Sequence, residues 1–222
     1  MSRRDNAALR CTSCHMHLPL CVCELVPRIE TETRLVLVIH RYEDRKPTNT
    51  GRIATACLPN SEVLVRGHEG RDAAVAFAPH TDPVLLFPHE DAEPLERMVP
   101  ASRPVTLVVP DGTWRQASKM RRRVPGLTDV RCVSLPASPD RAPLRLRAEA
   151  HAHGLSTLEA IARALGVLEG PAVQAALERL YLTIVERTLW MRGALATHEV
   201  TTGIPEAASR ESPRGGGAPS GA

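Results

Sequence analysis

The sequence predicts an α/β fold in which a mostly parallel sheet is flanked by helices, with a small metal-binding module at the amino terminus. Short apolar runs alternate with stretches of helical periodicity, which is typical of α/β domains. The 222 residues, 43% of them hydrophobic, suffice for one substantial core and a small appendage. Four cysteines mark that appendage. We expect a module at residues 1–30, an α/β domain at residues 31–198 and a tail at residues 199–222.

The amino-terminal module is predicted from the spacing of its cysteines. Four cysteines within thirteen residues follow the pattern C-x2-C-x6-C-x-C, in a segment too short and polar to form a core of its own. They are Cys11, Cys14, Cys21 and Cys23. Four thiolates at this spacing favour a tetrahedral Zn²⁺ site, whose binding energy would fold the segment. An iron–sulfur cluster uses the same ligands, and disulfides are the non-metal alternative.

The expected compartment favours metal over disulfides. The opening residues MSRRDNAALR contain no apolar h-region, and the pair Arg3-Arg4 is not followed by one, so no export signal is recognised. No apolar stretch is long enough to span a bilayer. We therefore expect a cytoplasmic protein without membrane contact, in which the thiols stay reduced.

Five apolar runs are predicted to be strands. Each is rich in Val, Ile or Leu and is bounded by polar residues or prolines. In chain order they are Leu35–Ile39, Val63–Val65, Val84–Phe87, Val105–Val109 and Val130–Val133. Because helical patterns lie between them, we expect the strands to be mostly parallel.

Helices are predicted after the first and fourth strands and throughout the carboxy-terminal third. The first is the short run 53–58, and the second begins at Trp114. A capping box at Ser156 predicts a helix that Gly166 ends, and Gly170-Pro171 predicts the start of a long helix that runs to about Arg192. Beyond residue 198 the chain is rich in Gly, Pro, Ser and Ala, so we expect a disordered tail.

The tetrapeptide Asp111-Gly112-Thr113-Trp114 follows the fourth strand and opens a helix. Ligands of α/β sheets collect outside the carboxyl ends of strands, so a carboxylate and an indole at this position predict a reactive site. Aromatic residues make up only 3% of the chain, and Trp114 is the best candidate for one stacked base. A simple Asp-Gly turn is the alternative, but the helical spacing that follows argues against a hairpin.

Basic residues gather directly behind this tetrapeptide. They far outnumber acidic residues between positions 113 and 147, whereas the net charge of the whole chain is only +3. Arg115, Lys119 and Arg122 stand at i, i+4 and i+7 and therefore share one helical face. A polyanion along this face would bring a nucleotide to Asp111, so we predict RNA contact here. A merely solvated charged face is the alternative.

A further anion site is predicted between the first strand and the short helix. Thr48, Asn49 and Thr50 are all good amino-terminal caps, and Arg52 follows them. The free amides of the helix start, with Arg52 beside them, would hold a phosphate or a carboxylate, and we predict that these four residues bind RNA. Ordinary capping explains one of these residues and is the structural alternative.

Several motifs occur in a recognisable order. They are the cysteine pattern, HRYEDRKPTNTGR, VLLFP, VVPDGTWRQASKM, SLP and LRLRAEAHAHGLSTLEA. In content and order they resemble the DTW-domain family, which includes the bacterial tRNA-uridine aminocarboxypropyltransferases. The resemblance covers about residues 11–190. It implies a SPOUT-like α/β domain with a carboxy-terminal trefoil knot, a feature that sequence reasoning alone would never propose.

The resemblance also implies an activity, the transfer of the 3-amino-3-carboxypropyl group of S-adenosylmethionine to N3 of a uridine in tRNA. S-adenosylmethionine would be the co-substrate, Zn²⁺ a structural metal and tRNA the partner, with no obligate protein partner expected. N3 of uracil is weakly acidic, so Asp111 becomes the candidate general base, flanked by Thr113 and Trp114 in the catalytic motif. Holding the cofactor's ammonium group and orienting the uracil are the other roles open to Asp111.

The implied cofactor site involves several loops. Attack at Cγ requires the cofactor's carboxylate to be held, and we expect its donors at Ser156 and Thr157 or at the Thr48-Asn49-Thr50 string. Loops after two predicted strands would line the adenosine pocket together with Asp111 and Gly112. Their residues are Leu86, Phe87, Pro88, Ser134, Leu135 and Pro136. A SPOUT-type RNA methyltransferase and a non-catalytic zinc-containing RNA-binding protein are the alternative functions.

Overall fold

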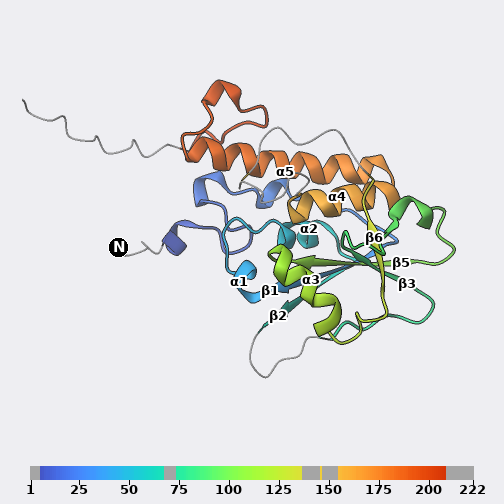
Figure 1. Cartoon of the computed structure of the whole chain (residues 1–222). Helices are drawn as coiled ribbons and strands as arrows, with labels where there is room; N and C mark the ends of the chain where they lie inside the picture. The colour runs from blue at the N-terminus through green and yellow to red at the C-terminus, as the bar shows by residue number, and fades with distance from the viewer. Residues whose placement is uncertain (1–5, 68–73, 137–145, 147–154, 209–222) are drawn as a thin grey trace, which may run out of the picture.

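The molecule is built around one parallel sheet with helices on both faces (Figure 1). The computed structural model describes residues 6–67, 74–136, 146 and 155–208. Six strands form the sheet in the order β2-β1-β5-β3-β6-β4, and every neighbouring pair is parallel. The strands are β1 (Arg34–His40), β2 (Ser61–Arg66), β3 (Asp82–Leu86), β4 (Glu93–Pro94), β5 (Val105–Asp111) and β6 (Arg131–Ser134). The predicted α/β class is therefore confirmed.

All five predicted strands are present, and the sequence missed only β4. This sixth strand has two residues, one of them a proline, and pairs with β6 at the edge of the sheet. A segment of this length has no period-2 pattern to detect. Proline is tolerated there because an edge strand has one side without ladder partners.

Side chains of β1 alternate between two separate apolar cores. Leu35, Leu37 and Ile39 point into the larger core, whereas Val36 and Val38 point into the smaller one on the opposite face. Because β1 is buried on both faces, it appears in the sequence as a continuous apolar run. The same holds for β5, its neighbour in the middle of the sheet.

Helices cover the two faces unequally. The larger core lies under α2 (Gly51–Cys57), α4 (Thr157–Leu168) and α5 (Pro171–Met191), and α4 packs along α5 (Figure 1). The opposite face is covered by α3 (Trp114–Arg123), whose Met120 belongs to the smaller core. A short helix, α1 (Arg41–Asp44), follows β1 directly. No helix within the described ranges is both long and apolar enough to cross a membrane.

The predicted end of α4 at Gly166 is wrong. The helix continues through Leu168, and the backbone amide of Glu169 still donates to the carbonyl of Leu165. Gly166 serves interhelical packing instead, because a Cβ at this position would lie 2.0 Å from the side-chain oxygen of Gln174 on α5. The helix breaker is Gly170, which has a φ of 107° and stands before Pro171, the predicted start of α5.

The segment after α5 differs from the predicted disordered tail. Val200, Ile204 and Ala208 pack against the larger core. The carboxylate of Glu186 on α5 accepts hydrogen bonds from the backbone amides and hydroxyl groups of Thr201 and Thr202, at 2.6–3.0 Å. Composition failed here because a few apolar and threonine contacts with α5 order residues 199–208. Residues 209–222 lie outside the described part of the chain.

The amino-terminal module shares the core of the α/β domain. Cys14, Met16, Leu20 and Val22 all belong to the larger core. The buried guanidinium of Arg187 on α5 donates to the carbonyl oxygen of Cys21 at 2.9 Å. The module therefore depends on α5 for its apolar packing and on Arg187 for satisfying its backbone.

The connection between β6 and α4 leads into the carboxy-terminal helices, the part of the chain in which the resemblance implies a trefoil knot. Most of that connection, residues 137–145 and 147–154, lies outside the described residues. The knot and the SPOUT relationship therefore stay predictions.

Candidate functional site

The candidate site lies at the carboxyl edge of the sheet, where the predicted residues gather. The strands β1, β5, β3 and β6 are consecutive neighbours in the sheet and end at His40, Asp111, Leu86 and Ser134. Because all strands are parallel, the loops that follow them leave from one edge. The sequence predicted a site at this edge from Asp111 and Trp114 and expected the loops after two other strands to join it, and the strand order places these loops side by side.

Asp111 is the centre of this edge and is buried, with 5% of its surface exposed. Asn49, in the loop before α2, donates from its amide to Oδ2 of Asp111 at 2.5 Å. Thr157, the first residue of α4, donates from its hydroxyl group to Oδ1 at 2.7 Å. One carboxylate thus fastens two segments that lie 62 residues before it and 46 residues after it in the chain.

Gly51 allows this arrangement and was missed by the sequence analysis. A Cβ at Gly51 would lie 2.8 Å from Oδ2 of Asp111 and 3.1 Å from the side chain of Leu37. Any larger residue would therefore push the first turn of α2 away from the carboxylate. The only signal in the sequence was a glycine at the start of a helix. Nothing in the sequence indicated that the Asp111 carboxylate packs directly against this glycine.

The Thr48-Asn49-Thr50 string is turned toward the protein interior. Asn49 and Thr50 are buried, and the hydroxyl of Thr50 accepts from the backbone amide of Leu158 on α4 at 3.5 Å. Arg52 forms an ion pair with Asp44. The string therefore joins α2 to Asp111 and α4, and its three residues also line a neighbouring pocket.

Thr113 and Trp114 follow Asp111 at the start of α3, the helix that covers the smaller core. Thr113 caps α3: its hydroxyl accepts from the amide of Gln116 at 3.3 Å, and its own amide donates to the Gln116 side chain at 2.8 Å. Trp114 is 40% exposed, and its ring centroid lies 5.7 Å from that of Phe87, which follows β3. An indole supported on one side by Phe87 remains accessible to a flat ligand.

His40, at the end of β1, is held as a neutral ring. Its Nδ1 lies 3.1 Å from the amide nitrogen of Gln116 and accepts the backbone amide of Tyr42 at 3.3 Å. Burial, and then the positive charge of Arg41, lower the pKa of His40. The geometry assigns the ring proton to Nε2, because Nδ1 serves as an acceptor.

The loops predicted to line an adenosine pocket are brought together. Leu86-Phe87-Pro88 and Ser134-Leu135-Pro136 follow the neighbouring strands β3 and β6, and the backbone amide of Phe87 donates to the carbonyl of Val133 at 3.0 Å. Ser156 caps α4 in the predicted capping box with Glu159. Gly112 lies between these loops and His40, because β5 separates β3 from β1.

The predicted basic face is exposed along α3. Arg115 and Arg122 are exposed, and Lys119 is half-buried. The opposite side of α3 packs Ala117 and Met120 against the protein. The helix begins at the carboxyl edge, so this face extends away from the candidate site.

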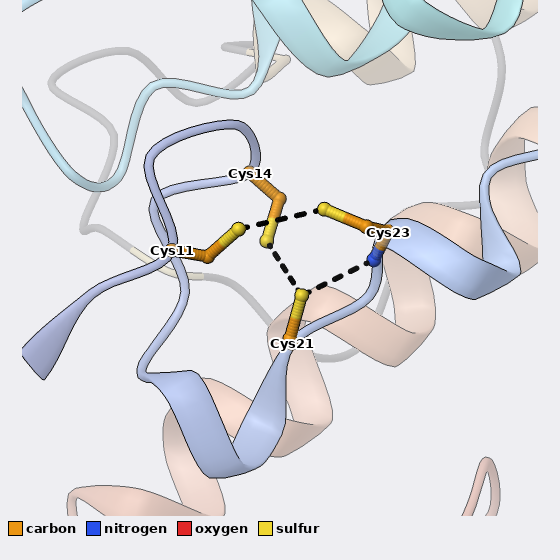
Figure 2. Close-up of side chains that lie close together, drawn as sticks. All are labelled: Cys11, Cys14, Cys21 and Cys23. Atoms are coloured by element: carbon orange, nitrogen blue, oxygen red, sulfur yellow. Dashed lines mark hydrogen bonds between the residues drawn. The ribbon is translucent and has the colours of Figure 1, made fainter.

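The four predicted metal ligands converge to one point, as Figure 2 shows. Their sulfur atoms all lie within 4.8 Å of one another, with Cys11 to Cys23 at 3.5 Å and Cys14 to Cys21 at 3.7 Å. Zn–S bonds of about 2.3 Å in a tetrahedron separate the sulfur atoms by about 3.8 Å. The four cysteines are free thiols, so their donor set and spacing fit a tetrahedral Zn²⁺ ion.

The backbone of the module also favours a thiolate at Cys11. Hydrogen bonds from the backbone of Cys14 and Ser13 lower the pKa of Cys11 to about 6. The turn that provides them is closed by a bond from the amide of His15 to the carbonyl of Cys11 at 2.9 Å, with His15 at a φ of 58°. The positive φ at His15 is a strained conformation that keeps this turn tight around the sulfur.

A pocket of about 140 Å³ lies between the module, the end of α5 and the Thr48-Asn49-Thr50 string. Its apolar floor includes Met16, Leu20 and Ile53. Two arginines, Arg10 and Arg192, contribute its positive charge. Nothing in the sequence analysis placed these two arginines together, since they lie at opposite ends of the chain.

Comparison with known proteins gives the family. A profile of the DTW domain matches residues 8–189, which is most of the chain. The chain belongs to the DTW-domain family. This membership confirms the resemblance drawn from the motif order. No solved structure matches the chain significantly.

Several relatives of the chain are named tRNA-uridine aminocarboxypropyltransferases. The protein named tRNA-uridine aminocarboxypropyltransferase 2 from Drosophila melanogaster is 28% identical over 83% of this chain and 76% of its own length. The Macaca fascicularis protein of that name is 29% identical over 72% of this chain. The Arabidopsis thaliana protein named tRNA-uridine aminocarboxypropyltransferase A is 27% identical over 72% of each chain. This chain spans just over half, 56%, of the macaque protein.

Proposed function

We propose that this DTW-domain protein is a tRNA-uridine aminocarboxypropyltransferase that uses S-adenosylmethionine as the donor. The observation that carries the proposal is the convergence on Asp111 of the two other motif segments, PTNTG through Asn49 and the LSTLEA helix through Thr157. The family motifs therefore meet at one site, and relatives 27–29% identical to this chain are named for this activity. A cytoplasmic location agrees with the proposed tRNA substrate.

The proposed reaction is a single displacement. N3 of the uridine attacks Cγ of the methionine part of S-adenosylmethionine, the Cγ–S bond breaks, and its electron pair stays on sulfur in 5′-methylthioadenosine. The N3 proton passes to a base, and the new bond joins N3 to the aminocarboxypropyl group. The protein must therefore orient Cγ, rather than the methyl carbon, toward N3.

The donor is placed in the loops after β5, β3 and β6. These three strands are neighbours, so Gly112, Phe87 and Ser134 leave the sheet side by side. Ligands of parallel α/β sheets bind in such loops at the carboxyl edge. The exposed indole of Trp114, backed by Phe87, is available there for stacking on the uracil or on the adenine.

Asp111 is assigned a role that acts through Thr157. Both carboxylate oxygens already accept hydrogen bonds, and 5% exposure leaves little room for a base ring to reach them. Thr157 is half-buried, and its hydroxyl oxygen can accept the N3 proton while its own proton passes along the existing hydrogen bond to Asp111, which is the final proton acceptor. In this assignment Thr157 touches the substrate and Asp111 holds and polarises it.

The tRNA is placed along α3. Arg115 and Arg122 are exposed on a helix that begins beside Asp111, so a bound phosphate chain leads toward the carboxyl edge. The four-cysteine module would hold Zn²⁺ in a structural role, because all four ligand positions are filled by thiolates and none is left for water.

Mass spectrometry of nucleosides tests the proposed function. The protein is incubated with unmodified tRNA and S-adenosylmethionine, and the tRNA is digested to nucleosides. The expected product is a uridine heavier by one aminocarboxypropyl group, with 5′-methylthioadenosine released in equal amount. A uridine heavier by one methyl group would replace the proposal with methyl transfer, and tRNA binding without any product would leave an RNA-binding protein.

A further inference from the structure

The pocket between the module and α5 contains two guanidinium groups, neither of which has an acidic partner among the described residues. Arg10 donates to the carbonyl of His15 at 2.9 Å, and Arg192 donates to the carbonyl of Leu146 at 2.9 Å. Within the part of the chain that the structure describes, neither arginine has a carboxylate within 4.0 Å. Among the described residues each side chain thus has one backbone contact that holds it in place, and it has further N–H donors that a ligand can use.

The two arginines repel each other in the free protein. Burial, followed by the positive charge of Arg192, lowers the pKa of Arg10. Two like charges on one small pocket destabilise the folded state unless an anion lies between them. Arg192 caps the carboxyl end of α5, which explains its position but not the presence of Arg10 beside it.

Residues from at least four segments line this pocket, one of them Leu146 in the connection between β6 and α4. Arg10 comes from the module, Arg192 from the end of α5, and Thr48 and Asn49 from the loop after β1. Asn49 is also the residue that donates to Asp111, so the pocket adjoins the candidate site. Two fixed guanidiniums above an apolar floor are suited to one tetrahedral or planar oxyanion.

We propose that the pocket of Arg10 and Arg192 binds one backbone phosphate of the substrate tRNA, close to the nucleotide that is modified. This inference rests on the proposed function. The donor loops follow β5, β3 and β6, whereas the pocket lies beside the loop after β1, on the other side of Asp111. Arg192 is exposed and Arg10 half-buried, so a phosphate can reach both from solvent.

The pocket and the basic face of α3 then flank the carboxyl edge from two sides. The module and the end of α5 belong to the side of the larger core, and α3 covers the opposite face of the sheet (Figure 1). An RNA strand that contacts both must cross the edge at Asp111 and Trp114. Two phosphate anchors on either side of the edge would fix which nucleotide enters the site.

The double variant Arg10→Ala/Arg192→Ala tests this site. Fluorescence anisotropy measures tRNA binding across a range of KCl concentrations, and steady-state kinetics measure KM for tRNA and for S-adenosylmethionine. We expect tRNA affinity to fall about tenfold and the slope of log K against log salt to decrease by about 1. The KM for S-adenosylmethionine should stay unchanged.

The matched control is Arg28→Ala/Arg179→Ala. It removes the same charge from the same two parts of the molecule, the amino-terminal segment and α5, at exposed positions outside the pocket. Arg192→Ala alone is the second variant should the double variant fold poorly, because it leaves the Arg10–His15 contact of the module intact.

The outcomes separate this inference from the proposed function. Equal tRNA binding by the double variant and its control, with normal modification by the wild-type protein, would refute the phosphate site and leave the function standing. A raised KM for S-adenosylmethionine with unchanged tRNA affinity would also overturn it, since the oxyanion would then be the donor's carboxylate. A wild-type protein that neither binds nor modifies tRNA would refute both.

Discussion

Replacing Asp111 by asparagine tests the centre of the candidate site with the smallest possible change of shape. The carboxylate accepts one hydrogen bond on each oxygen, from Asn49 at 2.5 Å and from Thr157 at 2.7 Å. The new amide can keep both contacts, because its oxygen accepts from Asn49 and the Thr157 hydroxyl can rotate to accept from its nitrogen. What disappears is the negative charge that strengthens both bonds.

The expected cost to folding is modest. A charged acceptor makes hydrogen bonds roughly twice as strong as a neutral one, so two weakened bonds reduce the free energy of unfolding by about 1–2 kcal/mol. For a domain of this size that lowers Tm by about 3–6 °C. The protein remains folded at 25 °C, because typical domains have about 5–15 kcal/mol of stability.

The expected cost to activity is larger. In the Asp111→Asn variant the Thr157 hydroxyl points its proton away from position 111, so it can neither relay a proton nor keep its orientation, and kcat should fall about 100-fold or more. Affinity for tRNA should stay within about twofold. Thr157→Val is the matched variant and should reproduce the loss of kcat.

The assays are product formation by nucleoside mass spectrometry and thermal unfolding followed by circular dichroism. Wild-type kcat in Asp111→Asn, with the variant fully folded, would remove Asp111 from any part in the reaction. A normal rate in Thr157→Val together with an inactive Asp111→Asn would instead refute the path through Thr157.

Three further predictions concern other parts of the molecule. Metal analysis should find one zinc ion per chain, lost on Cys14→Ser but retained in the Cys132→Ala control, because only the former removes one of four converging thiolates; equal zinc in both would contradict the site. Glu186→Gln should reduce stability by about 2 kcal/mol at pH 7. Burial opposes ionisation of Glu186, but its hydrogen bonds from Thr202 and Thr201 outweigh burial and lower its pKa. The extra stability of the wild-type protein in urea unfolding should therefore be complete above about pH 5 and shrink as the pH falls below the ordinary glutamate pKa of about 4.3. A constant difference in stability down to about pH 3 would argue against a stabilising charge on Glu186. The double variant Arg115→Ala/Lys119→Ala should weaken tRNA binding and flatten its salt dependence. The control Arg97→Ala/Arg103→Ala, away from α3, should do neither. Identical salt-dependent binding curves for the two double variants would show that RNA does not bind along this face.

The apolar pattern predicted most of the fold because the forces involved are local in sequence. Every one of the five long strands was found, since strands buried on both faces leave continuous runs of Val, Ile and Leu. The sequence also predicted the capping box at Ser156 and the start of α5 at Gly170-Pro171, because a cap and the amide it satisfies lie within one helical turn. The prediction that Gly166 ends α4 was wrong because this glycine makes room for Gln174 of the neighbouring helix α5, and such a contact between helices leaves no local pattern.

The candidate site was only partly visible from the sequence. Strand-end position identified Asp111, and short-range spacing identified the four cysteines, which the structure brings together. Asn49 was assigned to RNA, yet it donates to Asp111, because nothing local indicates that a residue 62 positions away is its partner. Arg10 and Arg192 carried no signal at all.

The sequence by itself determined the family, the parallel strands, the cysteine cluster and the acidic residue at the end of β5, because each depends on residues within a few positions of one another. Only the tertiary structure decided that Asp111 is buried and holds Asn49 and Thr157, that Glu186 orders the segment 199–208, and that Arg10 meets Arg192. Such contacts join segments brought together by the packing of helices on a sheet, and packing follows from the whole set of buried surfaces rather than from any one segment.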